Sequence, residues 1–127
     1  MCKFSLPKNY SQTLQSFEAQ LATIAAMLWA DSVDQLATQA QTLQQYFQHH
    51  IQPLDAEQLP TEQRSRFRSV QTELHRQMRL LQTDLLFLRN AHQADTASQR
   101  QQQVGDRLVS LRNYCAVLRQ ESGEESP

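Results

Sequence analysis

The apolar residues of this chain recur in alternating steps of four and three positions along four separate stretches. This spacing is typical of an α-helix that buries one face. It predicts helices over residues 11–30, 32–52 and 61–91, and a fourth that ends near residue 118. The four predicted stripes are Tyr10, Leu14, Phe17, Leu21, Ile24 and Leu28; Val33, Leu36, Ala40, Leu43, Phe47 and Ile51; Phe67, Val70, Leu74, Met78, Leu81, Leu85 and Leu88; and Val104, Leu108, Leu111, Cys115 and Leu118.

Capping residues and prolines indicate where these helices begin and end. Ser32, with Gln35 three positions later, has the pattern of a capping box for the second helix. That helix should end before Pro53, because proline disfavours a helical conformation in the preceding residue. Thr61 is expected to cap the third helix. The cap of the fourth helix is expected at Asp95 or Thr96.

Four amphipathic helices joined by short loops predict an all-α fold, an antiparallel four-helix bundle with a long C-terminal helical hairpin. The third helix has roughly 30 residues and spans about 45 Å. We expect one domain over residues 1–120, followed by an acidic, disordered tail over residues 121–127.

The composition supports a helical fold and shows an uneven distribution of charge. Only 2 glycines and 4 prolines occur, and good helix formers dominate. The formal net charge is −1, yet residues 61–119 carry ten arginines against five acidic residues, a formal charge of +5. This basic half is compatible with an acidic protein partner or with nucleic acid, although a solvated helical face is the simpler interpretation.

The sequence has neither the di-metal motif of helical bundles nor a glycine-rich phosphate loop, whereas Ser/His/Asp and Cys/His sites are not defined by spacing along the chain. Glu73 and His75 are two positions apart, not three as in di-metal helical bundles, and the adjacent His49 and His50 diverge on a helix. Cys115 belongs to the core stripe, where cysteine acts as a small apolar residue. A chain with 2 glycines has no glycine-rich phosphate loop. We therefore expect no enzymatic activity, no cofactor and no metal.

The N-terminal segment, the apolar runs and the cysteines indicate the cellular compartment. The segment MCKFSLPKNY lacks the apolar region of a signal peptide, and no apolar run approaches the roughly 18 residues needed to cross a membrane. Cys2 and Cys115 do not suggest a disulfide framework, which fits a reducing compartment. The expectation is a cytoplasmic protein without membrane insertion.

Asp84 lies in an otherwise apolar part of the third helix, within the sequence HRQMRLLQTDLLFL. Helical geometry places it at the margin of the core stripe, beside Gln77. A partly buried carboxylate needs a partner, and an antiparallel turn near residue 94 places Asp84 opposite residues 104–107. Arg107 is the first candidate and Arg100 the second. We predict an ion pair between Asp84 and Arg107 that fixes the register of the hairpin.

Three apolar residues of the third helix, Leu80, Leu86 and Phe87, lie off its main stripe. A helix that is apolar on more than one face needs more than one neighbour. Two partners within the bundle would provide this cover, and a homodimer or a partner protein would also do so.

The second hairpin, VQTELHRQMRLLQTDLLFLRNA followed by QRQQQVGDRLVSLRNYCAVL, resembles the cyanobacterial PatD family, named for its control of heterocyst frequency. The resemblance covers residues 65–118 and is weak in the first two helices, where LQQYFQHHI is the nearest match. It implies a small, cytoplasmic, non-enzymatic regulator associated with the tubulin-like division protein FtsZ. In an organism that forms no heterocysts, the implied role is in cell division. The family supplies no functional residues to carry over by position.

The partner surface is expected on the third helix, where off-stripe apolar residues accompany outer arginines. Arginine is electrostatically suited to FtsZ-type proteins, which are acidic. Two alternatives stay open. One is a nucleic-acid-binding protein that uses the arginines of the third and fourth helices, which the lack of stacking aromatics disfavours, and the other is a structural homodimeric adaptor. The predicted partner-binding residues are Arg76, Arg79, Leu86, Phe87 and Arg89.

Overall fold

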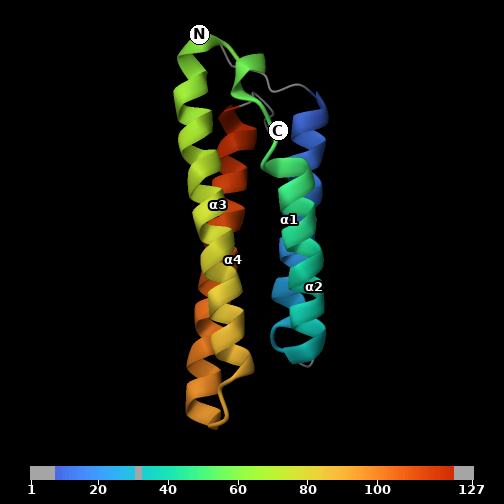
Figure 1. Cartoon of the computed structure of the whole chain (residues 1–127), viewed down its shortest axis with the longest axis vertical. Helices are drawn as coiled ribbons and strands as arrows, with labels where there is room; N and C mark the ends of the chain where they lie inside the picture. The colour runs from blue at the N-terminus through green and yellow to red at the C-terminus, as the bar shows by residue number, and fades with distance from the viewer. Residues whose placement is uncertain (1–7, 31–32, 122–127) are drawn as a thin grey trace.

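The chain folds into four long α-helices, arranged as two antiparallel hairpins side by side (Figure 1). The computed structural model describes residues 8–30 and 33–121, so Ser32 of the predicted capping box and residues 122–127 of the predicted tail lie outside it. The elements are α1 (Lys8–Met27), α2 (Val33–Tyr46), the π-helical turn η1 (Phe47–Ile51), the 3₁₀ helix η2 (Ala56–Gln58), α3 (Thr61–Arg89) and α4 (Ala94–Glu121). The predicted all-α bundle is confirmed.

The two hairpins contact each other unequally. Helix α4 packs against α3 along its length and against α1, whereas the contact between α2 and α3 is the least extensive between α-helices. With 29 residues, α3 is longer than α1, which has 20. The α3–α4 hairpin therefore extends beyond the turn between α1 and α2 at one end of the bundle (Figure 1). The fold is tight within the second hairpin and more open along α2 and α3.

The core consists of the predicted stripes. Every stripe residue is buried except Val70, which is partly buried, and Val33, whose side chain is outside the described part. Aromatic rings join the first two helices, with the centroids of Phe17 and Phe47 5.7 Å apart. Each fully buried leucine or phenylalanine contributes roughly 1.5–3 kcal/mol relative to an exposed one. The apolar stripes therefore supply most of the stabilisation of the bundle.

The run that begins with α2 ends in a π-helical turn, which the sequence does not indicate. The N–H of Gln52 donates to the carbonyl of Phe47 at 2.8 Å, a step of five residues in place of four. Phe47 and Ile51 both lie on the buried face, as their spacing of four positions predicts. The side-chain amide of Gln71 on α3 donates to the carbonyls of Ile51, Gln52 and Leu54 at 3.1, 3.3 and 2.9 Å. These bonds end the helical run at Gln52, as predicted.

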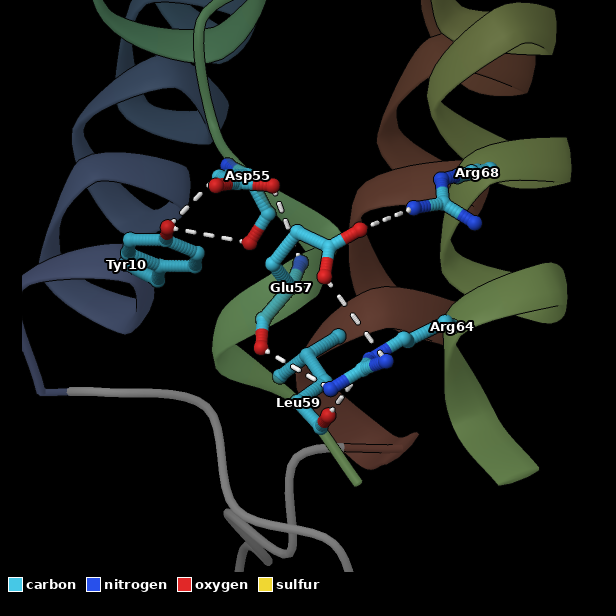
Figure 2. A network of polar contacts seen from close by, with 6 residues as sticks. All are labelled: Tyr10, Asp55, Glu57, Leu59, Arg64 and Arg68. Atoms are coloured by element: carbon cyan, nitrogen blue, oxygen red, sulfur yellow. Dashed lines mark hydrogen bonds and ion pairs between the residues drawn. The ribbon is translucent and has the colours of Figure 1, made fainter. Parts of the chain in front are cut away.

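The segment between α2 and α3 is packed against the end of the bundle (Figure 2). On one side, the hydroxyl of Tyr10 donates to the carbonyl of Asp55 at 3.1 Å and accepts from its N–H at 3.0 Å. On the other side, the Glu57 carboxylate lies 3.7 Å from the guanidinium of Arg64 and 3.0 Å from that of Arg68. Figure 2 shows that these contacts attach the segment to both hairpins.

The predicted cap of α3 is wrong. Thr61 is the first helical residue, and Pro60 holds the N-cap position without a side-chain hydrogen bond. The carbonyl of Pro60 accepts from the N–H of Gln63 at 2.9 Å. The φ of Pro60 is −55°, which the proline ring fixes near the helical value and which suits the entry into a helix.

The predicted cap of α4 is also wrong, by two or three positions. Because α4 begins at Ala94, both Asp95 and Thr96 lie within its first turn. The carbonyl of Gln93 accepts from the N–H of Ala97 at 2.9 Å, so Gln93 precedes the helix. Asp95 still has a favourable place, since the helix dipole stabilises an acid in the first turn.

Candidate interaction surface along helix α3

The predicted pair between Asp84 and Arg107 forms in the structure. The Nε of Arg107 on α4 lies 2.9 Å from the Asp84 carboxylate on α3. Asp84 is 6% exposed, so its charge is shielded from solvent. A second nitrogen of Arg107 donates to the side-chain oxygen of Gln77 at 3.1 Å. Asp84 is therefore engaged inside the hairpin, which makes it a structural residue and not part of a partner-binding surface.

The pair belongs to a longer chain of polar side chains along α3. The Gln77 amide donates to the Glu73 carboxylate at 3.0 Å, and Arg76 donates to the same oxygen at 3.0 Å. The hydrogen bond from Gln77 is the largest effect and lowers the pKa of Glu73; burial opposes it, and Arg76 lowers the pKa further. The role of Glu73 escaped the sequence reasoning, although its four-residue spacing from Gln77 is the signal for a contact on one helical flank.

Arg100, the second candidate partner of Asp84, lies over an aromatic ring instead. Its guanidinium carbon is 4.7 Å from the centroid of the Phe87 ring. A cation held over a ring face is attracted by the ring quadrupole. Phe87 stays 46% exposed, but it faces α4 and is partly covered by its own chain.

Most arginines of the basic half pair with carboxylates of the same chain. Besides the pair with Asp84, ion pairs join Arg64 and Arg68 to Glu57, Arg76 to Glu73, Arg89 to Asp34 and Arg119 to Glu18. Arg79 and Arg112 are exposed, and within residues 8–30 and 33–121 no carboxylate pairs with either. Three carboxylates from outside residues 61–119, those of Glu18, Asp34 and Glu57, therefore offset part of the formal charge of +5, which disfavours a phosphate-binding surface.

A hollow of about 880 Å³ lies between η1 and the middle of α3. Its walls include the buried ring of Phe47 and the partly buried side chain of Leu80. His75, Arg76 and Arg79 also line it, whereas none of the described residues around it is a carboxylate. The hollow therefore combines an apolar wall with basic side chains.

A second hollow of about 510 Å³ lies further along the same two helices. It is lined by Leu86 and Arg89 of α3 and by Asp34 of α2, and the Arg89 guanidinium is 3.8 Å from the Asp34 carboxylate. Gln82 lines both hollows. We refer to the two hollows together as the α2–α3 groove.

The structure divides the predicted partner-binding residues between two sides of α3. Four of the five line the groove: Arg76, Arg79, Leu86 and Arg89. Phe87 contacts α4 and is separated from them. The groove itself escaped the sequence reasoning. The available signal was Ala40, a small residue in the α2 stripe, which lines the second hollow.

Titratable side chains form no metal-binding cluster among the described residues. Cys115 is fully buried, and burial raises the pKa of its thiol far above the usual range. The ring of His75 packs edge-on against Phe47, with centroids 6.0 Å apart. Within the part of the chain that the structure describes, no helix is both long and apolar enough to cross a membrane.

Comparison with known proteins gives no relative of this chain. It matches no family model, no curated protein and no solved structure with significant similarity. The resemblance to the PatD family therefore rests on the sequence of the second hairpin alone.

Proposed function

We propose that this chain is a non-enzymatic regulatory protein that binds FtsZ-type division machinery, the partner that the resemblance to the PatD family implies, and that it binds this partner through α3. The observation that carries the proposal is Arg79, an exposed arginine that pairs with no carboxylate of the described chain and lines the α2–α3 groove. Leu86 on the same helix is 55% exposed. Arginine is enriched at protein interfaces, and its charge favours an acidic partner.

Co-sedimentation with a purified FtsZ-type protein and GTP tests the proposal. We expect the chain to pellet with the polymer at low ionic strength. The substitution Arg79→Glu should reduce the pelleted fraction, because it places a negative charge opposite an acidic partner. Arg112→Glu is the matched control, since Arg112 is equally unpaired but lies on α4, away from the groove.

Two outcomes would contradict the proposal. The first is no association with the FtsZ-type protein at low ionic strength. The second is tight binding of RNA or DNA with a steep log–log dependence on salt, which would favour a nucleic-acid-binding protein.

A further inference from the structure

Two glutamine side chains of the α2–α3 groove contain polar atoms without a hydrogen-bond partner. The Oε1 of Gln44 on α2 and the Nε2 of Gln82 on α3 are shielded from solvent, and neither bonds to a described residue. Both side chains line the larger hollow. Because buried polar atoms are nearly always paired in folded proteins, both amides gain a hydrogen bond when they turn into the groove towards a ligand that supplies one donor and one acceptor.

The charge of the larger hollow favours an acidic ligand. No carboxylate of the described residues pairs with Arg79 in this hollow, and Arg76 forms one ion pair, with Glu73. None of the described residues that line this hollow carries a carboxylate, so none of them would repel a carboxylate of the ligand or compete with it for Arg79. Pairs between arginine and carboxylate are among the stronger hydrogen bonds in proteins.

The length of the groove suits an extended chain. Along α3 the groove runs from Gln71 to Arg89, about 27 Å at 1.5 Å per residue. An extended peptide of about eight residues covers that length. Its backbone N–H and C=O groups are free to pair with Gln44 and Gln82, whereas a helix uses these groups internally except at its ends.

The same side chains fit a peptide better than a nucleic acid. Phe47, the aromatic residue lining the larger hollow, is buried and presents no ring face for bases. A nucleic acid also needs several unpaired cations in a row, and the groove offers Arg79, since Arg89 pairs with Asp34.

We infer that the α2–α3 groove binds an acidic, extended peptide segment of the partner protein. Gln82 donates to a backbone carbonyl of the segment, Gln44 accepts from a backbone N–H, and Arg79 pairs with a carboxylate. The partly buried side chain of Leu80 contacts the apolar side chains that alternate with the acidic ones. This inference rests on the proposed function, since it names the part of the partner that is recognised.

Fluorescence anisotropy with the full chain and labelled probes tests the inference. The main probe is a peptide of about ten residues that alternates glutamate with valine or leucine. We expect it to bind saturably at low ionic strength. A peptide with lysine in place of each glutamate, and a thymidine oligonucleotide of about the same length, should not saturate. A flat acidic-peptide titration, an equal affinity for the lysine peptide, or a higher affinity for the oligonucleotide would overturn the inference.

A charge reversal locates the bound peptide. Arg79→Glu should weaken binding of the acidic peptide by about tenfold or more, whereas Arg112→Glu should leave it within about twofold. The two substitutions change the net charge equally, and both positions are exposed. An equal loss in both variants would show diffuse attraction to the protein surface and would overturn the assignment to the groove.

Replacing a glutamine of the groove with leucine distinguishes an effect on peptide binding from an effect on folding stability. Gln82→Leu removes the unpaired Nε2, so the free protein should unfold at the same or a higher temperature, while the acidic peptide binds more weakly. Gln20→Leu is the control, because Gln20 on α1 also has a shielded, unpaired side-chain atom but lines no part of the groove. It should change the unfolding temperature without changing peptide binding. Unchanged peptide binding by Gln82→Leu would overturn the role of Gln82.

The co-sedimentation experiment tests the proposed function, and the peptide-binding experiment separately tests the groove as the recognition site. A chain that pellets with the FtsZ-type protein but does not bind the acidic peptide would retain the proposed function and overturn the groove as its recognition site. A chain that binds the peptide in an Arg79-dependent manner but does not pellet would retain the groove and overturn the proposed partner.

Discussion

At the scale of single residues, the α3–α4 hairpin depends on charged side chains that meet where the two helices pack. The side chain of Asp84 is 8% exposed and that of Arg107 is 26% exposed. Arg107 also bonds to Gln77, so one guanidinium satisfies two polar groups of α3. A shift of the hairpin by one residue would break both contacts. The pair therefore specifies the register more than it adds to the total stability.

Removing the carboxylate should be destabilising. Asp84→Ala leaves the Arg107 charge without its partner, and we expect the free energy of unfolding to fall by about 1–3 kcal/mol. Urea denaturation measures the change. Asp106→Ala, at an exposed acid of α4, should change it by no more than about 0.5 kcal/mol. An unchanged midpoint for Asp84→Ala would show that the pair does not fix the hairpin.

The stability contributed by Glu73 should depend on pH. Because the hydrogen bond from Gln77 lowers the pKa of Glu73 in the folded protein, its contribution is fully present above the ordinary glutamate value of about 4.3. It is lost as the pH falls through the lowered folded-state pKa. The difference in unfolding free energy between the wild type and Glu73→Gln should therefore shrink on acidification. Urea titrations between about pH 3 and pH 7 measure it, and a constant difference would contradict this prediction.

The Asp84 pair could be predicted from the sequence, whereas the pair between Glu18 and Arg119 could not. Asp84 and Arg107 belong to adjacent helices joined by a short turn, so helical rise and turn position bring them together. Glu18 and Arg119 are 101 positions apart and meet because α1 packs on α4. That contact depends on how one hairpin is rotated against the other, which an apolar stripe does not specify.

At the scale of elements, the helices follow from their apolar stripes, but their ends depend on longer-range contacts. The π-helical turn η1 lies where the side-chain amide of Gln71 on α3 donates hydrogen bonds to the carbonyls that end the helical run. Thr61, Asp95 and Thr96 are good local cap residues, yet each lies inside a helix. Local preference for a cap is worth about 1 kcal/mol, and packing of a whole helix outweighs it.

Gln71 should be important for the end of η1. Its amide donates to three carbonyls, so Gln71→Ala leaves those groups without this partner. We expect the free energy of unfolding to fall by about 1–3 kcal/mol. Circular dichroism during thermal unfolding provides the measurement. Gln48→Ala, at an exposed position of η1, is the control and should have little effect. Equal stabilities of the two variants would exclude a capping role for Gln71.

At the scale of the whole molecule, the large exposed apolar residues of the described part are spread over different helices. Leu86 lines the groove beside α2, and Phe87 lies under Arg100 of α4. Val109 is on α4, and Trp29 follows the end of α1. Large apolar side chains that are exposed singly are normal on monomeric proteins. The groove could not be predicted from the stripes, because it results from the uneven distance between the two hairpins.

We therefore expect the free chain to be monomeric. Analytical ultracentrifugation should give a mass near 14.7 kDa that is independent of concentration. The physical reason is that a stable dimer buries about 800 Å² on each partner, and scattered apolar side chains do not provide such a face. A mass that rises with concentration towards that of a dimer would favour the structural homodimeric adaptor.

The packing of α1 on α4 affects how the protein is made in the cell. The first helix of the chain contacts the last one, and the ion pair between Glu18 and Arg119 joins them. Synthesis proceeds at about 5–20 residues per second, so α1 leaves the ribosome on the order of 5–20 s before the end of α4. During that time its apolar stripe packs against α2, whereas α4, its more extensive contact, is not yet complete. Newly made chains are therefore exposed to aggregation mainly through α1, and chaperones that bind apolar segments would protect them at this stage.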